Sequence, residues 1–329
     1  MEDKVRLHEN KELFQDAVIA TSQQKGIREI YIEKDYWVTF ALYTIFNNKI
    51  GKEAVFKGGT SLLKCFGLIQ RFSEDIDLVI KRSKNETGNQ QKSKLKKISN
   101  CLSEVLPEVE VVGLTNKLGM IRKTVHAYER LFTGNFGQVR DNIILESTWL
   151  GSFEPYTKNQ LSSFIYEMML KKQQHEIIDK YALNPFEVTV LNPQRTLCEK
   201  IMSLVRFSQT TEPITNLRNK IRHIYDLHLL LNDANLNSFF YSDELDEMLL
   251  KVAGDDIKSF KNNNDWLFNH PSNAIIFSET EKTWNQIKNV YTVSFSEMVF
   301  GDFANEKDIL RTLVSISDRL KTIRWNFKG

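Results

Sequence analysis

Hydrophobic patterning changes near residue 190 and divides the chain into two regions. In the first fifty residues, the segments LFQDAVIATSQQ and EKDYWVTFALYTIF carry apolar side chains at helical spacing and contain neither proline nor glycine, which predicts two helices. Runs rich in β-branched and aromatic residues follow and predict strands. These strands span residues 53–57, 75–80, 109–114, 123–129, 142–150 and 186–191, with helices at 60–68 and 91–106 between them.

Beyond residue 191 the pattern is helical almost throughout. Asn192-Pro193 opens the first helix with proline near its first position, where the missing N–H does no harm. The predicted helical segments are residues 193–207, 216–231, 242–253, 278–300 and 305–323. We therefore predict an α+β fold, in which residues 1–190 form a domain of N-terminal helices and a small mixed sheet, and residues 191–329 form a helical domain.

Composition narrows the class of protein. The formal charge of +2 comes from 44 basic and 42 acidic side chains, so any nucleic-acid binding depends on a local basic patch. The three cysteines are odd in number and far apart, which favours a reducing, cytoplasmic location without disulfides. The longest apolar run, from Trp37 to Phe46, covers ten residues, about half of the roughly 20 that a membrane span needs. We expect no membrane partner.

Two aspartates in the predicted strand DIDLVI are the first candidates for chemistry. Side chains alternate along a strand, so Asp75 and Asp77 share one face while Ile76 lies on the other. Two carboxylates about 7 Å apart repel each other unless a cation lies between them. Mg²⁺ suits this arrangement, because it binds a few carboxylate oxygens together with phosphate oxygens. The alternative is a surface strand with two solvated aspartates.

The segment just before these aspartates has the composition of a phosphate-binding turn. Lys57, Gly58, Gly59, Thr60 and Ser61 connect a predicted strand to a predicted helix. Glycine permits close approach of the backbone, and the free N–H groups at the start of a helix attract phosphate. An ordinary tight turn, with Thr60 or Ser61 as the helix cap, is the alternative.

These two motifs together carry a family resemblance. The segment FKGGTSLLKCFGLIQRFSEDIDLVI resembles the signature of the AbiEii/AbiGii toxin family of nucleotidyltransferases, which belongs to the DNA polymerase β-like superfamily. EKDYWVTFAL, LNPQRTLCEKIMSLVR and IRHIYDLHLLL resemble the family as well, from about residue 30 to about residue 235. The resemblance implies a toxin of a toxin–antitoxin or phage-defence system. It also implies Mg²⁺-dependent transfer of a nucleoside monophosphate from an NTP, with release of pyrophosphate.

The resemblance adds three site residues. Glu146, in a strand with apolar neighbours, is the candidate for a third metal-binding carboxylate, with an ion pair to Arg140 as the alternative. Lys200 lies at the margin of an apolar helical stripe, and its place in the family implies contact with the NTP phosphates. Asp226 lies in a helix that is apolar almost all round, so it needs a partner. The family implies that Asp226 is a base for the acceptor hydroxyl or an orienter of Lys200, whereas Arg222 offers an ordinary ion pair.

Other polar positions have weaker patterns. Ser73, just before the aspartates, either binds a phosphate oxygen or holds the turn. Residues 81–97 carry seven lysines and arginines against the single acid Glu86, which is typical either of a solvated helix or of a surface that grips RNA. His223 and His228 are five residues apart, which is not a metal-binding spacing on a helix.

The resulting hypothesis places the NTP between the two predicted domains. Asp75, Asp77 and Glu146 hold Mg²⁺, and Asp75, Asp77, Lys200 and Asp226 carry the catalysis. The acceptor implied by the resemblance is tRNA, and a cognate antitoxin is an expected partner. Transfer to a protein or to a small molecule is one alternative, and a non-catalytic NTP-binding module is another.

Overall fold

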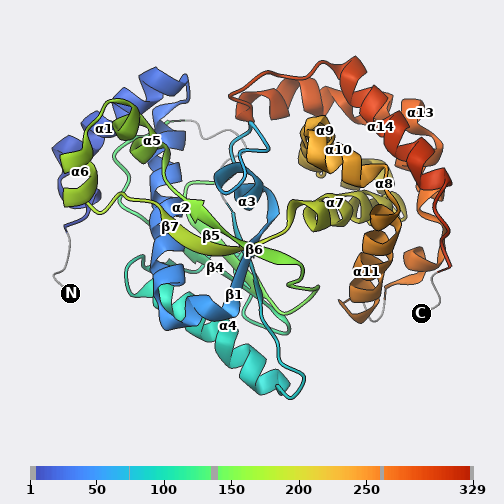
Figure 1. Cartoon of the computed structure of the whole chain (residues 1–329), viewed down its shortest axis with the longest axis horizontal. Helices are drawn as coiled ribbons and strands as arrows, with labels where there is room; N and C mark the ends of the chain where they lie inside the picture. The colour runs from blue at the N-terminus through green and yellow to red at the C-terminus, as the bar shows by residue number, and fades with distance from the viewer. Residues whose placement is uncertain (1–4, 74, 135–139, 260–262, 327–329) are drawn as a thin grey trace. The chain divides into compact units, whose positions relative to one another are not determined.

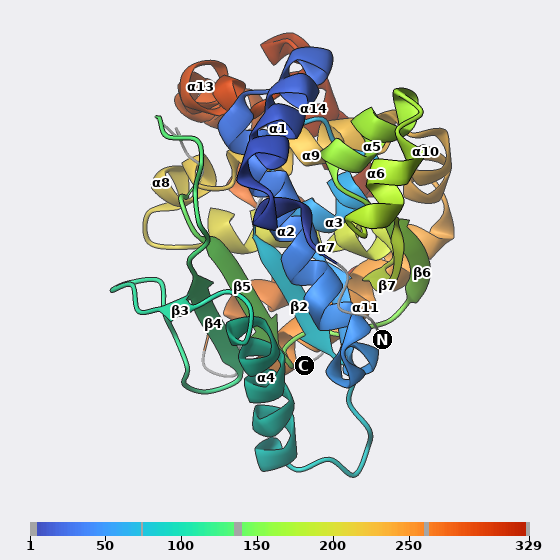
Figure 2. The same cartoon turned by 90° about the vertical axis from the view of Figure 1, so that its left-hand side faces the viewer.

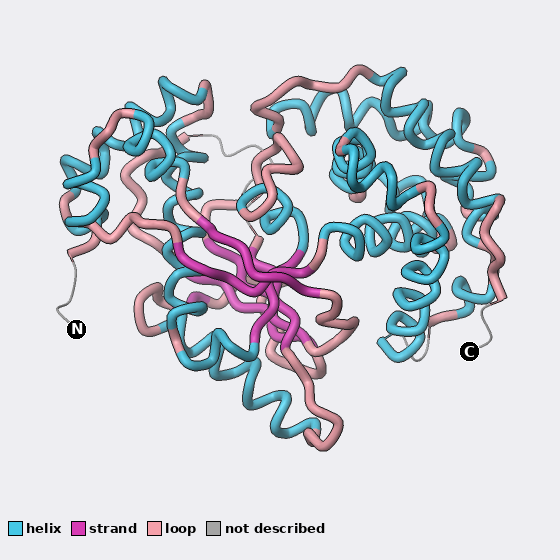
Figure 3. Tube along the Cα trace, in the orientation of Figure 1, coloured by secondary structure: helices cyan, strands magenta, loops and turns pink. Residues whose placement is uncertain are grey.

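A computed structural model describes residues 5–73, 75–134, 140–259 and 263–326 of the chain (Figure 1). Contacts between Cα atoms divide the chain into two compact units. Unit 1 comprises residues 1–67, 72–149 and 156–190, and unit 2 comprises residues 68–71, 150–155 and 191–329. Strands are confined to one part of the chain, and the rest is helix and loop (Figure 3). No helix within the described ranges is both long enough and apolar enough to cross a membrane.

Unit 1 is built on a seven-stranded sheet in the order β3-β4-β5-β2-β1-β7-β6. The strands are β1 (Ala54–Lys57), β2 (Ile76–Ile80), β3 (Glu108–Val109), β4 (Ile121–His126), β5 (Ile143–Thr148), β6 (Tyr156–Leu161) and β7 (Phe186–Leu191). The sheet is mixed: β1 is antiparallel to β2 and parallel to β7, whereas β2 is parallel to β5. This mixed sheet with helices agrees with the predicted α+β class.

Helices cover the sheet of unit 1. They are α1 (Lys11–Lys25), α2 (Glu29–Asn47), α3 (Gly58–Lys64), α4 (Gly88–Ser103), α5 (Phe164–Lys171) and α6 (His175–Lys180), with short 3₁₀ turns at Leu7–Glu9 and Lys49–Glu53. Figure 2 shows α2 and α4 in front of one face of the sheet, and α4 packs on β2, β4 and β5. The central strands are buried, because helices cover apolar side chains such as Val55, Leu78 and Leu145.

Unit 2 is helical. Its helices are α7 (Pro193–Ser208), α8 (Pro213–Arg218), α9 (Ile221–Asn232), α10 (Ala234–Phe240), α11 (Asp243–Ser259), α12 (Ile275–Ser278), α13 (Thr280–Val290) and α14 (Glu306–Lys321). Short irregular helical turns lie at Asp265–Phe268, Pro271–Asn273, Tyr291–Phe295 and Ser296–Met298. Helix α14 buries Ile309, Leu313, Ile316 and Leu320 at alternating spacings of four and three, as expected of an amphipathic helix.

The structure corrects one predicted strand and the predicted cap of α3, and it adds a strand. The predicted strand 109–114 was wrong beyond Val109, since the following residues form turns. Strand β6 was not predicted, because YTKNQL is polar and lies at an edge of the sheet. Thr60 and Ser61 do not cap α3: the helix begins at Gly58, and its N-cap residue Lys57 makes no side-chain capping bond. By contrast, the proline start of α7 is confirmed, with the Asn192 side chain accepting from the Gln194 N–H.

Candidate functional site

A row of charged side chains crosses four adjacent strands of unit 1. Asp77 on β2 is in direct register with Lys57 on β1 and with Glu146 on β5. Glu146 is in turn in register with Lys123 on β4. Directly paired residues lie on the same face of a sheet. The order across this face is therefore Lys57, Asp77, Glu146, Lys123, with two carboxylates flanked by two lysines.

The two carboxylates in the middle of the row repel each other. Burial is the largest cause that raises the pKa of Asp77 to about 7, and the negative charges of Glu146 and Asp75 act in the same direction. Lys57 and Lys123 oppose this increase only in part. The Lys123 ammonium lies 3.4 Å from a Glu146 carboxylate oxygen. Asp77 is therefore a buried carboxylate whose negative charge the two neighbouring lysines stabilise only in part, which favours binding of a cation.

Asp75 lies just before β2, and Arg140 is its partner. The Arg140 guanidinium Nη1 lies 3.2 Å from Asp75 Oδ1, and both side chains are partly exposed. The sequence offered Arg140 as the alternative partner of Glu146, and this pairing was wrong. Lys123 takes that place because β4 brings it into register with Glu146.

The backbone at Gly58 comes close to Asp77. Gly58 has a φ of +82°, in the left-handed region that L side chains rarely adopt. A Cβ atom at this position would lie 2.4 Å from Asp77 Oδ2, which is too close for any real contact. Glycine is thus required at residue 58 for two independent reasons, and the start of α3 lies directly against the carboxylate.

The hydroxyl groups of the predicted phosphate-binding turn make internal hydrogen bonds. Thr60 Oγ1 donates to the Asp75 carbonyl at 2.6 Å and lies 3.0 Å from Ser73 Oγ. Ser61 Oγ donates to the Gly58 carbonyl at 2.9 Å. Thr60 and Ser61 are buried. The Thr60 contacts join α3 to the segment that carries the aspartates, and the Ser61 bond closes the first turn of α3. The side chains therefore hold the turn, and phosphate binding by this turn would depend on its backbone N–H groups.

In unit 2, Asp226 on α9 is fully buried and is neutralised by two cations. Arg71 binds it through Nε and Nη2, at 2.7 and 2.8 Å, and the Lys200 ammonium of α7 lies 2.7 Å from Asp226 Oδ2. The sequence offered Arg222 as the ion-pair partner of Asp226, and this pairing was wrong. Although burial opposes it, the charges of Arg71 and Lys200 hold the pKa of Asp226 well below its ordinary value. So stable an anion is a weak proton acceptor, which favours the orienting role over that of a base.

His223 was missed as a neighbour of this cluster. It precedes Asp226 by three residues on α9, a spacing that brings side chains together on a helix. Its Nδ1 is enclosed and has no hydrogen-bond partner among the described residues. Burial is the main cause that holds the pKa of His223 well below its ordinary value, with Lys200 and Lys220 acting in the same direction, so the ring is neutral at pH 7. The helical spacing to Asp226 was the available signal.

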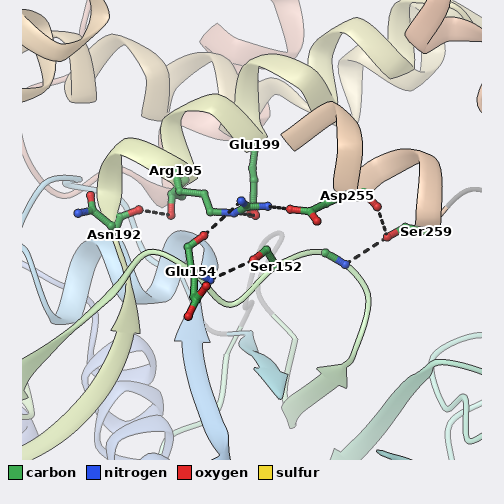
Figure 4. Close-up of polar contacts among 9 residues, drawn as sticks. Ser152, Glu154, Asn192, Arg195, Glu199, Asp255 and Ser259 are labelled. Atoms are coloured by element: carbon green, nitrogen blue, oxygen red, sulfur yellow. Dashed lines mark hydrogen bonds and ion pairs between the residues drawn. The ribbon is translucent and has the colours of Figure 1, made fainter. Parts of the chain in front are cut away.

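A second buried ion network in unit 2 also starts from α7 (Figure 4). Arg195 binds Glu199 at 3.1 Å and Asp255 of α11 at 2.8 Å, and it donates to the Glu154 carbonyl at 3.2 Å. Ser259 of α11 accepts from the backbone N–H of Gly151. These contacts tie residues 150–155 to α7 and α11 and serve the scaffold.

The donor set of unit 1 suits a magnesium ion. Among the described residues, no group of three or more His, Cys, Asp or Glu side chains is arranged to hold a metal ion as it stands. Mg²⁺ does not require such a cage, because it binds through one or two carboxylates together with phosphate oxygens and water. Asp75 and Asp77 could supply hard oxygen ligands, and Glu146 lies in register with Asp77. A divalent cation would offset the burial and the carboxylate repulsion that raise the pKa of Asp77.

One comparison with known proteins identifies a family for this chain. The family model described as "Nucleotidyl transferase AbiEii toxin, Type IV TA system" matches residues 41–306. No curated protein matches the chain. The matched region includes the glycine turn, the aspartates, Glu146, Lys200 and Asp226, and membership indicates nucleotidyl transfer in a type IV toxin–antitoxin system with an NTP as substrate and an antitoxin as partner. The chain belongs to the AbiEii nucleotidyltransferase toxin family.

Proposed function

We propose that the protein transfers a nucleoside monophosphate from an NTP to tRNA in a Mg²⁺-dependent reaction, and that this modification makes it a toxin. The observation that supports the proposal best is the buried carboxylate of Asp77, which lies in register with Glu146 and close to Asp75 and has a raised pKa. Asp75 and Asp77, with Glu146 beside them, would hold the ion. When bound, it would neutralise negative charge on the phosphates during transfer.

The bond changes define what the protein must provide. An acceptor hydroxyl attacks the α-phosphorus, a new O–P bond forms, and the bond to the β-phosphate oxygen breaks as pyrophosphate leaves. The hydroxyl proton passes to a base. Asp226 is a poor base because its pKa is held low, so we assign it the orientation of Lys200, for which the family resemblance implies a contact with NTP phosphates. Gly58 and Gly59 lie where backbone N–H groups begin α3, and Lys57 adds a positive charge beside Asp77.

An RNA acceptor is supported by the basic run after β2. Lys94 is used internally, because it pairs with Glu53 and Glu86. Lys92, Lys96 and Lys97, by contrast, are exposed on α4. Exposed lysines on one helix are suited to contact an RNA backbone without reading its sequence.

The test is transfer of label from each α-³²P NTP to total bacterial RNA in the presence of Mg²⁺. We expect label on tRNA, and no label with the Asp75→Ala/Asp77→Ala variant. Reversal of charge at Lys92, Lys96 and Lys97 should abolish RNA labelling but leave NTP binding intact. Label on protein or on a small molecule would replace the tRNA proposal. Intact NTP binding without any transfer would favour a non-catalytic nucleotide-binding module.

A further inference from the structure

Helix α2 contains three consecutive charged residues that are almost completely buried. The exposed fractions of Glu33, Lys34 and Asp35 are 1%, 0% and 3%. Burying a charge is costly unless it is paired, and even a paired charge often stabilises a fold no better than apolar residues of similar size. Successive helical residues point in directions about 100° apart, so the three side chains reach different partners. Such an arrangement calls for an explanation other than stability.

Glu33 and Lys34 hold the two ends of the connection between β4 and β5. Glu33 accepts hydrogen bonds from the backbone N–H groups of Leu131, at 2.7 Å, and Phe132, at 3.1 Å. Lys34 donates to the carbonyl oxygens of Arg140 and Asn142, both at 2.5 Å. A buried ammonium group thus fixes the backbone on both sides of residue 141.

The residue held by Lys34 carries a guanidinium group into the carboxylate site. Arg140 binds Asp75 at 3.2 Å, and 40% of its side chain is exposed. Guanidinium groups bind phosphate through two parallel hydrogen bonds, which makes arginine well suited to a triphosphate. A nucleotide that binds at Asp75 would bring its phosphates within the same neighbourhood.

We propose that Arg140 contacts the phosphates of the bound nucleotide and that Lys34 is the positioning residue that aims it. The inference rests on the proposed function and adds two residues to it. Before substrate binds, Arg140 neutralises Asp75. When the nucleotide arrives, the guanidinium group exchanges this carboxylate for phosphate oxygens, while Lys34 keeps its backbone in place. The buried ammonium is explained by this geometric requirement, because water could satisfy the same carbonyl groups if position did not matter.

Equilibrium binding of each Mg–NTP, measured without an acceptor, tests the inference. Arg140→Ala should lower NTP affinity by about 10- to 100-fold, the effect of one charge-assisted contact. The affinity of the corresponding nucleoside, measured by competition, should stay unchanged. Arg140→Lys, which keeps the charge but loses the planar fork, should have an intermediate affinity.

A double-mutant cycle tests the positioning role. Lys34→Met should reproduce much of the loss in the native background but add less than about twofold to Arg140→Ala, because it acts through Arg140. Lys94→Met is the matched control, since Lys94 is also a clamping lysine of unit 1 but contacts neither end of the β4–β5 connection. It should leave NTP affinity unchanged. If Lys34→Met does not fold, Glu33→Gln, which loosens the other end of the connection, takes its place in the cycle.

The outcomes separate the two proposals. Failure of the native chain to bind any Mg–NTP would overturn the proposed function and, with it, this inference. Binding by the native chain that Arg140→Ala leaves unchanged would overturn the phosphate contact alone. An equal loss from Lys34→Met in the presence and absence of Arg140 would overturn the positioning role and make Lys34 a purely structural residue.

Discussion

Neutralising Asp77 should stabilise the protein in the absence of a metal ion while destroying its activity. Asp77→Asn keeps the shape of the side chain, so the close fit against Gly58 is preserved. It removes one of the two negative charges that are paired in register on β2 and β5. Residues at active sites often oppose stability in this way, because the site is built for a ligand that is not yet bound.

The size and sign of the effect follow from the pKa of Asp77. Burial and neighbouring carboxylates raise it to about 7 from an ordinary value of 3.8. The folded protein therefore binds more protons than the unfolded chain between about pH 4 and pH 7, and stability falls as pH rises through this window. Three pKa units correspond to about 4 kcal/mol as an upper limit. At pH 8 we expect Asp77→Asn to be more stable by about 2–4 kcal/mol, and at pH 4 the two proteins should be nearly equal.

Thermal unfolding followed by circular dichroism, with a chelator present, measures this difference. A gain of 2–4 kcal/mol corresponds to an increase in Tm on the order of 5–10 °C for a domain of this size. Added Mg²⁺ should raise the Tm of the native protein and leave that of Asp77→Asn unchanged. Asp75→Asn is the control: it loses its ion pair with Arg140, so it should gain no stability at pH 8. Lower stability of Asp77→Asn at pH 8, or an equal difference at pH 4 and pH 8, would refute the reasoning.

Three further predictions follow from the same contacts. Gly58→Ala should abolish label transfer and destabilise the fold by about 1–3 kcal/mol in a thermal melt, because the new Cβ atom would clash with Asp77 and the backbone has a positive φ. Gly59→Ala is the control, since Gly59 is not among the glycines with positive φ, and this variant should still fold. Asp226→Asn should lower the free energy of unfolding by about 3–5 kcal/mol in urea, because it removes the negative charge that pairs with two buried cations. Lys200→Met should fold but no longer transfer label from the NTP. If Asp226→Asn folds correctly and keeps full activity, Asp226 does not orient Lys200. Arg195→Met should cost about 2–4 kcal/mol in urea and leave the affinity for NTP unchanged, so a loss of affinity would argue against a scaffold role.

Much of the fold could be predicted because local pattern and burial agree. The strands at residues 76–80 and 143–148 each contain a run of buried apolar residues, and helix α7 begins at the proline that marked it. Strand β6 escaped prediction because its residues YTKNQL lack apolar alternation, and its place at the edge of the sheet leaves most of them exposed. The polar sequence of β6 does not indicate that this segment pairs with β7. Pairing that is made by the backbone alone leaves no signature in side chains.

The parts of the candidate site that depend on the alternation of side chains along one strand could be predicted from the sequence. The parts that depend on the register between two strands could not. Asp75 and Asp77 follow from the strand pattern alone. The register that places Lys123 beside Glu146 depends on the pairing of β4 with β5, which the sequence does not reveal. Arg71 and Asp226 are 155 residues apart, so no local spacing could connect them. For both pairs the sequence shows the charged residues but does not show which of them pair with each other.

Asp77 and Asp226 are both buried aspartates, but their surroundings favour different roles. Both are aspartates that burial alone would make less acidic. Asp226 meets two cations within hydrogen-bond distance, so its pKa falls and its charge is fixed. At Asp77 burial is the largest cause that raises the pKa to about 7, and the neighbouring carboxylates of Glu146 and Asp75 add to it. An anion that its own protein has already neutralised has little to offer a metal ion, whereas an anion crowded by others gains most from one. The surroundings of Asp77 therefore argue for a cation there, and those of Asp226 argue for its role as the support of Lys200.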